Sequence, residues 1–502
     1  MLRGGVQIQL FSGTSFKLPY FLWKYNGMGL HLRILHGSYY SNTSSILPLA
    51  IDFGATPDDI SKSVSKCGVE KLTILTTNMI IDQCGDKHSL FEFLPRLKEL
   101  HLTNHVGLDC VPHVFRSLES RSLKSLRVLR LIDSPTSSSH VTALVLPELT
   151  ALRSLTLTNF YCHGLCYSLC QMPYLEELSL SDVYMTGPPS IFSESLLIIP
   201  SLKIDFPSAL AGMTDLRLLE LKNGGEPAEI LSFASPGNTL TMAFKHLTKL
   251  AELTLGNCYG IDDLGSALAL MTDLRKLSCS YKIAPLACLE SLTRVLPQLQ
   301  KMESLRLLFG ALGNPTATAL ASTFVHLSSL VSLRLYWKDE GGLVSVISSL
   351  SHLTGLHALN LSGIDFGDKA AILALAKSLK SLRGLTELHL ERCRIKDAGL
   401  VLLAPSLVEP KSLMTLHMSR NTSVSKHTVG MFRFAMRHLQ EDNVTWPGDS
   451  DSESEDEDGP QDEDEESEEE DFESEEDEFE EDSESEVDEF LFEYDIEHDN
   501  NI

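Results

Sequence analysis

The chain has 502 residues, of which 43% are hydrophobic, so a large buried core is possible. Its formal net charge of −28 is carried by one end: residues 449–502 contain 32 Asp and Glu and no Lys or Arg, which leaves 37 acidic against 41 basic residues, a net of +4, in residues 1–448. No run of about 18 apolar residues occurs, so we expect no segment that spans a membrane.

The first segment, residues 1–66, shows no repeat. Its start, "MLRGGVQIQLFSG", has an early Arg but neither the continuous apolar stretch nor the cleavage site of a secretory signal. The ten cysteines are scattered through Leu-rich segments without paired spacing, which indicates reduced thiols and an intracellular protein, cytoplasmic or nuclear. The Asn-x-Ser/Thr sites, which we expect to carry no sugar, are Asn42, Asn360, Asn421 and Asn443.

A six-residue pattern with apolar residues at its first, fourth and sixth positions recurs through residues 67–447. The copies begin at Val69, Leu97, Leu126, Leu152, Leu175, Leu216, Leu250, Leu274, Leu305, Leu330, Leu356, Leu385 and Leu413. Most steps between successive starts are 23 to 31 residues long, within or near the 20–29 residues of leucine-rich repeats.

The spacing predicts one short strand and one outer segment in each copy. Two leucines separated by one residue point to the same side of a strand, and the leucine three residues earlier leads the chain into it. Residues 314–330 and 368–382 show helical apolar spacing, which favours helices in the outer segments. We therefore predict an α/β fold, a leucine-rich repeat solenoid (horseshoe) with about thirteen parallel strands on its concave face and helices outside. The repeat length, with Cys258 and Cys393, resembles the ribonuclease-inhibitor-like class.

Two steps are longer than one repeat. The step from Leu175 spans 41 residues and the step from Leu216 spans 34, and both contain Gly, Pro and Ser. Such loops are either tolerated surface insertions or contacts for a partner. At the ends of the array, part of residues 1–66 is expected to cap the first strand, and an amphipathic helix within residues 424–442 is expected to close the last one.

Catalytic and cofactor motifs do not occur. The sequence has no phosphate-binding G-x-x-x-x-G-K-[ST], no G-x-G-x-x-G after a strand, no H-E-x-x-H and no G-x-S-x-G, so we predict no catalytic residue and no cofactor. Cys162, Cys166 and Cys170, with His163 beside them, have a helical spacing that could hold zinc. Small apolar side chains also suit the inward face of an outer helix, so we interpret these cysteines as buried thiols and predict no metal site.

The concave face should present the side chain between the two leucines of each strand. This middle column is predicted to contain His101, Arg130, Thr156, Ser179, Glu220, Thr254, Ser278, Phe309, Arg334, Asn360, His389 and His417. It is no basic stripe, so we expect no direct binding of nucleic acid. The residues that we predict to contact a protein partner are Arg334, Tyr336 and Trp337 in one repeat and Glu387, His389 and Glu391 in another, because Arg, Tyr and Trp commonly anchor interfaces.

The last segment, residues 448–502, is predicted to be a disordered acidic tail, because like charges repel and little apolar surface can be buried. Residues 454–465 approach the pattern of a calcium loop but lack its first Asp, and diffuse cation binding is the other interpretation. Near the end, Phe490, Phe492 and Tyr494 alternate with other residues as in a strand. We predict that the acidic stretch attracts a basic partner, such as a histone or another basic protein, and that these aromatic residues dock on it.

Three family resemblances bear on function. Residues 67–442 resemble the sensor region of NLR immune receptors, whose nucleotide-binding domain this chain lacks. Repeats followed by an acidic tail also resemble the Ran GTPase-activating protein, which implies activation of a GTPase through one arginine, and the acidic leucine-rich nuclear phosphoproteins, whose repeat domain is much shorter. No motif here identifies such an arginine.

The prediction for the whole chain is a non-enzymatic scaffold. It would bind a folded protein on the concave face of the repeats and basic proteins through the tail. The alternatives are a GTPase-activating protein of the Ran GTPase-activating type and an NLR-like immune sensor fragment.

Overall fold

The computed structural model divides the chain into two units, residues 1–449 and residues 450–502. All described residues lie in the first unit. Before residue 97 the structure describes the backbone of residues 6–10, 16–17, 30–35, 51–52 and 69–76. From residue 97 to residue 446 it describes all except residues 105–123, 133–139, 143–145, 185–204, 223–239, 258–263, 282–285, 311, 339–340, 409–411, 422–423, 438 and 440–443.

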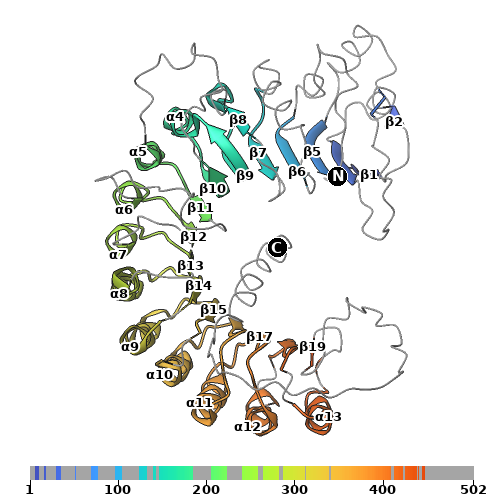
Figure 1. The fold of residues 1–502 in the computed structure, drawn as a ribbon, viewed down its shortest axis with the longest axis vertical. Helices are drawn as coiled ribbons and strands as arrows, with labels where there is room; N and C mark the ends of the chain where they lie inside the picture. Colours follow the sequence, from blue (N-terminus) through green and yellow to red (C-terminus); the bar gives the residue numbers. More distant parts are fainter. Residues whose placement is uncertain are drawn as a thin grey trace, which may run out of the picture. The chain divides into compact units, whose positions relative to one another are not determined.

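Parallel strands lie side by side in one sheet (Figure 1). In spatial order they are β1 (Val6–Leu10), β3 (Leu30–Leu35), β5 (Val69–Thr76), β6 (Glu99–Asn104), β7 (Val128–Ile132), β9 (Ser154–His163), β10 (Glu177–Tyr184), β11 (Leu218–Lys222), β12 (Glu252–Gly256), β13 (Lys276–Tyr281), β14 (Ser304–Phe309), β15 (Ser332–Tyr336), β16 (Ala358–Asn360), β17 (Glu387–His389), β18 (Thr415–His417) and β19 (Val444–Thr445). Strand β8 (His140–Thr142) pairs with the end of β9, and β2 (Phe16–Lys17) pairs with β4 (Ile51–Asp52) in a second sheet.

Helices follow the strands and lie on the outer side of the sheet, each beside the helix of the next repeat (Figure 1). They are α4 (Leu165–Cys170), α5 (Phe206–Ala211), α6 (Leu240–Phe244), α7 (Leu264–Leu268), α8 (Leu286–Val295), α9 (Asn314–Thr323), α10 (Leu343–Ser349), α11 (Lys369–Leu379), α12 (Asp397–Val408) and α13 (Lys426–Ala435). Short 3₁₀ helices are η3 (Leu146–Glu148), η5 (Leu296–Gln298), η6 (Phe324–His326) and η7 (Leu350–His352). The chain is thus a leucine-rich repeat solenoid, as predicted. No described helix has the length and apolar character needed to cross a membrane.

Local residues fix where several helices begin. Asp205 precedes α5, and its carboxylate accepts a hydrogen bond from the Ser208 N–H at 2.8 Å. Asp368 before α11 accepts from Ala370 N–H, and the Ser425 hydroxyl before α13 accepts from Thr428 N–H. Each side chain satisfies a backbone donor that the first turn of a helix leaves without an intrahelical partner.

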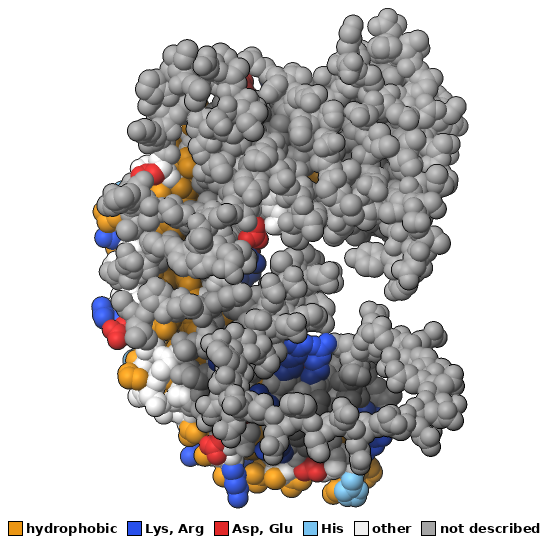
Figure 2. All heavy atoms as spheres, viewed as in Figure 1, with side chains coloured by type: hydrophobic (Ala, Val, Ile, Leu, Met, Phe, Trp, Pro, Cys, Tyr) orange, Lys and Arg blue, Asp and Glu red, His pale blue; other side chains and the backbone are white. Residues whose placement is uncertain are grey.

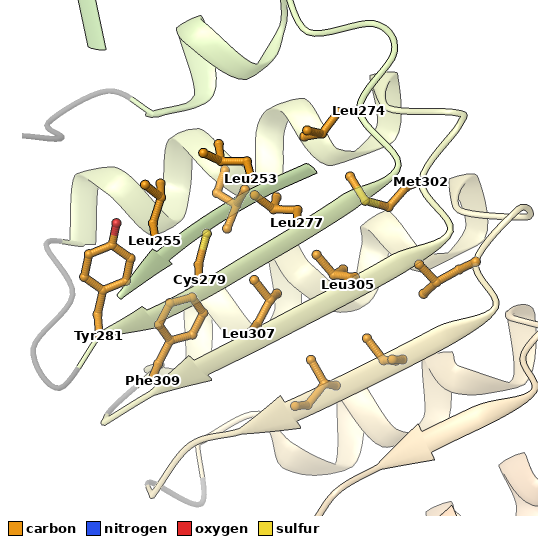
Figure 3. Packing of buried hydrophobic residues seen from close by; sticks show 14 of the residues in the cluster. Leu253, Leu255, Leu274, Leu277, Cys279, Tyr281, Met302, Leu305, Leu307 and Phe309 are labelled. Carbon is orange, nitrogen blue, oxygen red and sulfur yellow. The ribbon is translucent and has the colours of Figure 1, made fainter. Parts of the chain in front are cut away.

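The core consists of ladders of leucines between the sheet and the helices. Leu253, Leu277, Leu305 and Leu333 occupy the same register position on β12 to β15, and each is fully buried. Figure 3 labels the first three. Because alternate residues of a strand face the same side, a leucine at every second position is enough to build this ladder. Burying one leucine stabilises the fold by about 1.5–3 kcal/mol, so the repeats depend on stacking against their neighbours.

The register at β14 corrects one predicted repeat. Leu305 lies beside Leu277, and Leu307 lies beside Cys279, so the first apolar position of this repeat is Met302 (Figure 3). The steps from Leu274 to Met302 and from Met302 to Leu330 are then 28 residues each. The predicted start at Leu305 was wrong because Met can replace Leu at a buried position and because "LRLL" offers leucines in two registers. Phe309, which was predicted on the concave face, is buried, with 2% of its surface exposed.

Two backbone arrangements follow the two inward positions of a strand. In six repeats a residue with positive φ lies two residues after the second inward position: Asn159, Asp182, Asn257, Gly363, Arg392 and Arg420. Gly, Asn and Asp tolerate this conformation, whereas Arg adopts it with strain. In the repeats of β13, β14 and β15 the alternation continues instead, and Tyr281, Phe309 and Trp337 are buried. The rings of Tyr281 and Phe309 stack with centroids 6.4 Å apart (Figure 3).

A buried amide organises the loop after β17. The Asn421 side chain is fully buried and its Oδ1 accepts from the N–H groups of Cys393 and Ile395, both at 3.1 Å. Its Nδ2 donates to the carbonyls of Leu390 and Met418, both at 2.8 Å. Asn421 is one of the predicted unused glycosylation sites, and its burial makes it inaccessible in the folded chain. Asn421 provides hydrogen-bond partners for backbone N–H and C=O groups that follow the short strands β17 and β18.

Strands continue the sheet at both ends of the array. Strands β1 and β3, which lie within residues 1–66, pair with Ile8 beside Leu32 and Leu32 beside Leu72. At the other end, α13 lies within residues 424–442, where a helix was predicted, and β19 follows it and pairs with β18. The domain limits at residues 66 and 447 remain predictions. The two long insertions, residues 185–204 and 223–239, and the acidic tail lie outside the described residues.

Candidate protein-binding surface

The side of the sheet away from the helices, here called the inner face, carries the outward side chains of the strands. Its middle column consists of Thr156, Ser179, Glu220, Thr254, Ser278, Arg306, Arg334, Asn360, His389 and His417, which are half-buried and paired in register from β9 to β18. The register correction puts Arg306 in the place predicted for Phe309. Lys and Arg side chains gather on the inner side of the strands in the lower half of Figure 2.

In the first part of the inner face, acidic side chains are neutralised by neighbours. Glu220 accepts a hydrogen bond from the Ser179 hydroxyl at 2.6 Å, and its other oxygen lies 2.7 Å from the Lys222 ammonium. Burial alone would raise the pKa of Glu220, but Lys222, Ser179 and Arg130 together outweigh it and hold the pKa below its usual value. Similarly, Lys276 lies 3.1 Å from Glu252 on the preceding strand.

The last repeats bring two of the predicted residues, Glu387 and His389, into contact. His389 Nε2 lies 2.6 Å from Glu387 Oε1, and its ring stacks on that of His417 with centroids 4.5 Å apart. The hydrogen bond with His389 is the main reason that the pKa of Glu387 is lowered. Glu391 accepts from the Ser419 hydroxyl at 3.0 Å. Glu387, His389 and His417 therefore form one polar cluster across two neighbouring repeats, whereas Glu391 is bonded to Ser419.

The predicted Arg334, Tyr336 and Trp337 are not equivalent in the structure. Arg334 is half-buried on the inner face, next to Arg306. Tyr336 is 9% exposed and Trp337 only 2%, so neither ring presents the exposed surface that an interface anchor needs. Trp337 is buried because the strand alternation continues through it: Leu333, Leu335 and Trp337 share the inward side. The predicted aromatic anchors Phe490, Phe492 and Tyr494 lie outside the described residues.

The three clustered cysteines do not share a helix. Cys162 lies near the end of β9, whereas Cys166 and Cys170 lie on α4. Burial is the main cause that raises the pKa of Cys162 and of Cys166 to about 12, so both thiols stay protonated at neutral pH. No disulfide links the six cysteines in the described part of the chain. In that part there is also no cluster of three or more His, Cys, Asp or Glu placed to hold a metal ion.

A shallow crevice of about 280 Å³ lies where the strands begin, away from the middle column. It is lined by Arg153, Tyr174, Glu176, Asp215, Arg217 and Lys249. Two ion pairs in it join different repeats: Lys249 lies 2.6 Å from Asp215, and Arg153 Nε lies 3.9 Å from Glu176 Oε1. The Arg153 guanidinium also lies 5.2 Å from the centre of the Tyr174 ring. The sequence did not indicate this crevice, because its residues belong to different repeats.

No family model matches the chain. Among solved structures, an internalin from Listeria monocytogenes is 17% identical, with a TM-score of 0.41 over 72% of this chain and 83% of that chain. A leucine-rich repeat protein from Leptospira interrogans is 16% identical, with a TM-score of 0.40 over 79% and 95%. TLR13 in complex with ssRNA13 is 16% identical, with a TM-score of 0.39 over 77% and 57%. The fold of this chain is established by its own strand register and helix placement.

Proposed function

We propose that this protein is a non-enzymatic scaffold that binds a folded protein along its inner face. The observation that carries the proposal is the continuous middle column of polar and charged side chains from β9 to β18. At about 4.8 Å between strands, these ten strands extend over roughly 45 Å. A standard protein interface buries about 800 Å² on each partner, which a surface of this length can supply.

The chemistry of the inner face supports a protein partner over nucleic acid. Glu220, Glu252, Glu387 and Glu391 interrupt its positive charge. A duplex is recognised by a basic stripe, and single strands are held by exposed aromatic rings that stack on bases. Tyr336 and Trp337, which could have supplied such rings, are buried.

The acidic segment, residues 448–502, adds a second binding function to the proposal. Its 32 acidic residues would attract basic proteins, of which histones are one example, and raise their rate of association. Phe490, Phe492 and Tyr494 would then make short-range contacts. This function suits an intracellular protein of the cytoplasm or nucleus.

Matched arginine substitutions on the two sides of the repeats test the scaffold function. Thr254→Arg with Ser278→Arg obstructs the centre of the inner face, whereas Ser322→Arg with Ser348→Arg adds the same charge on the exposed outer helices α9 and α10. Proteins captured from a cell extract by the full chain should be lost with the first pair and retained with the second, at equal thermal stability. If both pairs retain the same partners, binding does not use the inner face.

The same preparations separate the scaffold from its enzymatic alternative. The parent chain is incubated with a panel of small GTPases, and the rate of GTP hydrolysis is measured. We expect no acceleration. Acceleration that disappears on substitution of one arginine would replace the scaffold by a GTPase activator.

A further inference from the structure

Helix α12 is apolar on its solvent side as well as on the side that packs against the core. Its buried leucines are Leu400, Leu403 and Leu407. On the opposite side the exposed residues, spaced three and four apart and so on one face, are Ala398, Val401, Pro405 and Val408. A helix that is hydrophobic all round is normally buried. The exposed side of α12 therefore has the composition of a contact surface.

Helix α13 adds two larger apolar side chains beside this surface. Met431 is 63% exposed and Phe434 is 70% exposed, and their spacing of three residues places them on one side of the helix. Helices α12 and α13 pack as neighbours, so their axes are about 8–10 Å apart. Hydrophobic side chains reach the surface along the lower edge of Figure 2, where these two helices lie in Figure 1. The outer apolar patch is defined here as Val401, Pro405, Val408, Met431 and Phe434.

The place of the outer apolar patch in the array does not account for its composition. The exposed sides of the earlier outer helices α8 and α9 carry polar residues, which include Glu290, Arg294, Thr318 and Ser322. A terminal repeat needs a polar outer side for solubility, and α13 has one in Lys426, Arg433 and Arg437. Met431 and Phe434 lie beside that polar side and add nothing to it. Contiguous apolar patches of this kind mark interaction sites.

Positive charge borders the outer apolar patch. The Arg437 guanidinium lies 4.8 Å from the centre of the exposed Phe434 ring. Within α11, α12 and α13 the Lys, Arg, Asp and Glu residues are Lys369, Lys377, Asp397, Lys426 and Arg433, so cations outnumber the one carboxylate. In physiological salt exposed charges act over about 8 Å, so these local cations, and not the net charge of the chain, determine which partner fits here.

We propose that the outer apolar patch is a docking site for an amphipathic helix of a partner protein, with Asp or Glu beside its apolar residues. Helices that dock in this way present apolar side chains over seven residues, a length of about 10.5 Å. Val401 and Val408 are also seven residues apart on α12. The acidic residues of the partner helix would meet Lys426 and Arg437 in charge-assisted hydrogen bonds.

A partner helix is favoured over a lipid surface. A helix that lies on a membrane has one apolar side and one side rich in Lys and Arg. Helix α12 contains neither Lys nor Arg, and its second side is packed against the core. The outer apolar patch lies on the helices, away from the inner face, so it is a second interaction surface beyond the proposed scaffold function.

The test measures binding of fluorescein-labelled peptides to the full chain by anisotropy in physiological salt. The first peptide is an amphipathic helix with Leu on one face and Glu beside it, and the second has Gln in place of Glu. Vesicles of phosphatidylcholine and phosphatidylserine, followed by cosedimentation, are the lipid probe. The variant pair is Val401→Ser with Met431→Ser. The matched control, Val325→Ser with Met242→Ser, removes the same side chains at exposed positions outside the patch.

The parent chain should bind the Glu peptide more tightly than the Gln peptide and should not sediment with the vesicles. Val401→Ser with Met431→Ser should weaken binding of the Glu peptide at least about tenfold, because burial of one such side chain contributes about that factor. The control pair should bind as the parent does. Lys426→Gln with Arg437→Gln should reduce the preference for Glu over Gln. Melting curves of all variants establish that each is folded.

Four results would overturn the docking site. They are no binding of the Glu peptide to the parent, equal binding by the Ser pair and the parent, equal binding of the two peptides, and binding of the vesicles in place of the peptide. Thr254→Arg with Ser278→Arg on the inner face should leave peptide binding unchanged, and its loss with that pair would also contradict the site. The scaffold function is judged by capture of a partner on the inner face, so either proposal can fail while the other stands.

Discussion

Individual side chains in the repeats of β13 to β15 have roles that their residue types do not indicate. Tyr281, Phe309 and Trp337 occupy a third inward position after the two buried apolar residues of their strands. In other repeats a residue with positive φ and then a buried apolar residue follow the strand's inward pair instead, such as Asp182 followed by Val183. The aromatic residues of this region therefore contribute to the packing of the core.

Trp337→Ala should destabilise the protein strongly. The substitution leaves a cavity beside the fully buried leucines of β15, for which a cost of about 3–5 kcal/mol is typical. Urea unfolding followed by circular dichroism measures the change, with Trp337→Phe as the milder control. An interface residue would instead leave the unfolding midpoint unchanged and weaken partner binding, which would contradict the buried position.

Glu220 should give the fold a contribution that depends on pH. Its folded pKa is lowered below the unfolded value of about 4.3, so its stabilising effect is complete at neutral pH and is lost as the pH falls through the folded pKa. Glu220→Gln should therefore lower the free energy of unfolding by about 1 kcal/mol at pH 7, and the difference from the parent should vanish below that pKa.

Denaturant unfolding of Glu220→Gln and the parent at pH 7 and at acidic pH checks this difference. Glu290→Gln on the exposed side of α8 serves as the control and should have little effect at either pH. A destabilisation by Glu220→Gln that is the same at both pH values would show that lost packing, and not the charge, is responsible.

At the scale of elements, helices α7 and α8 pack closely at a glycine. A Cβ at Gly265 on α7 would lie 2.6 Å from the carbonyl carbon of Ser291 on α8. The Gly265 N–H also donates to the Ser291 hydroxyl at 3.2 Å. The spacing between these two repeats is therefore set by the absence of a side chain.

Gly265→Ala should separate α7 from α8 and cost about 1–3 kcal/mol, the usual range for overpacking. Gly430→Ala on α13 is the matched control, because its Cβ would meet no atom within 4 Å. That change should stabilise the protein by up to about 1 kcal/mol, since alanine favours a helix. Thermal unfolding of the two variants compares them, and stabilisation by Gly265→Ala would contradict the close packing.

Most strands of the repeats could be predicted from the sequence. Apolar residues at the first, fourth and sixth positions of a six-residue segment indicate a turn that leads into a short strand. The prediction failed where the sequence offered two registers, at Leu305, Leu307 and Leu308. That single error hid the Arg306–Arg334 pair, since Phe309 stood in the place of Arg306. The alternation of Leu333, Leu335 and Trp337 along β15 explains why Trp337 is buried. The prediction placed Trp337 at an interface instead, because tryptophan is common there. His389 and His417 were predicted as successive members of the middle column, and the register of β17 and β18 pairs them.

At the scale of the whole molecule, charge is divided between two segments of opposite sign. Residues 1–448 carry a net charge of +4 and residues 449–502 carry −32, which together give the formal net charge of −28. Attraction between exposed charges is screened by salt. A function of the acidic segment should therefore be recognised by its dependence on ionic strength.

Binding of a histone to the full chain should weaken steeply with added salt and should be lost when residues 449–502 are removed. Replacing Phe490, Phe492 and Tyr494 by Ser leaves the charge unchanged and should weaken binding further at constant salt. Titration of labelled histone with the three proteins at two ionic strengths provides the measurement. If the Ser variant binds as well as the parent, the acidic segment acts by diffuse electrostatics alone.

Two tryptophans in separate repeats make the order of unfolding visible to fluorescence. Trp337 lies in the core at β15, whereas Trp446 follows β19 and packs edge-on against Phe432 of α13, with ring centroids 6.0 Å apart. A solenoid whose repeats contact mainly their neighbours can open at one end while the rest stays closed. In such a case the emission of Trp446 would shift to longer wavelength before that of Trp337, so chains with a single tryptophan would reveal whether the array opens from its last repeat.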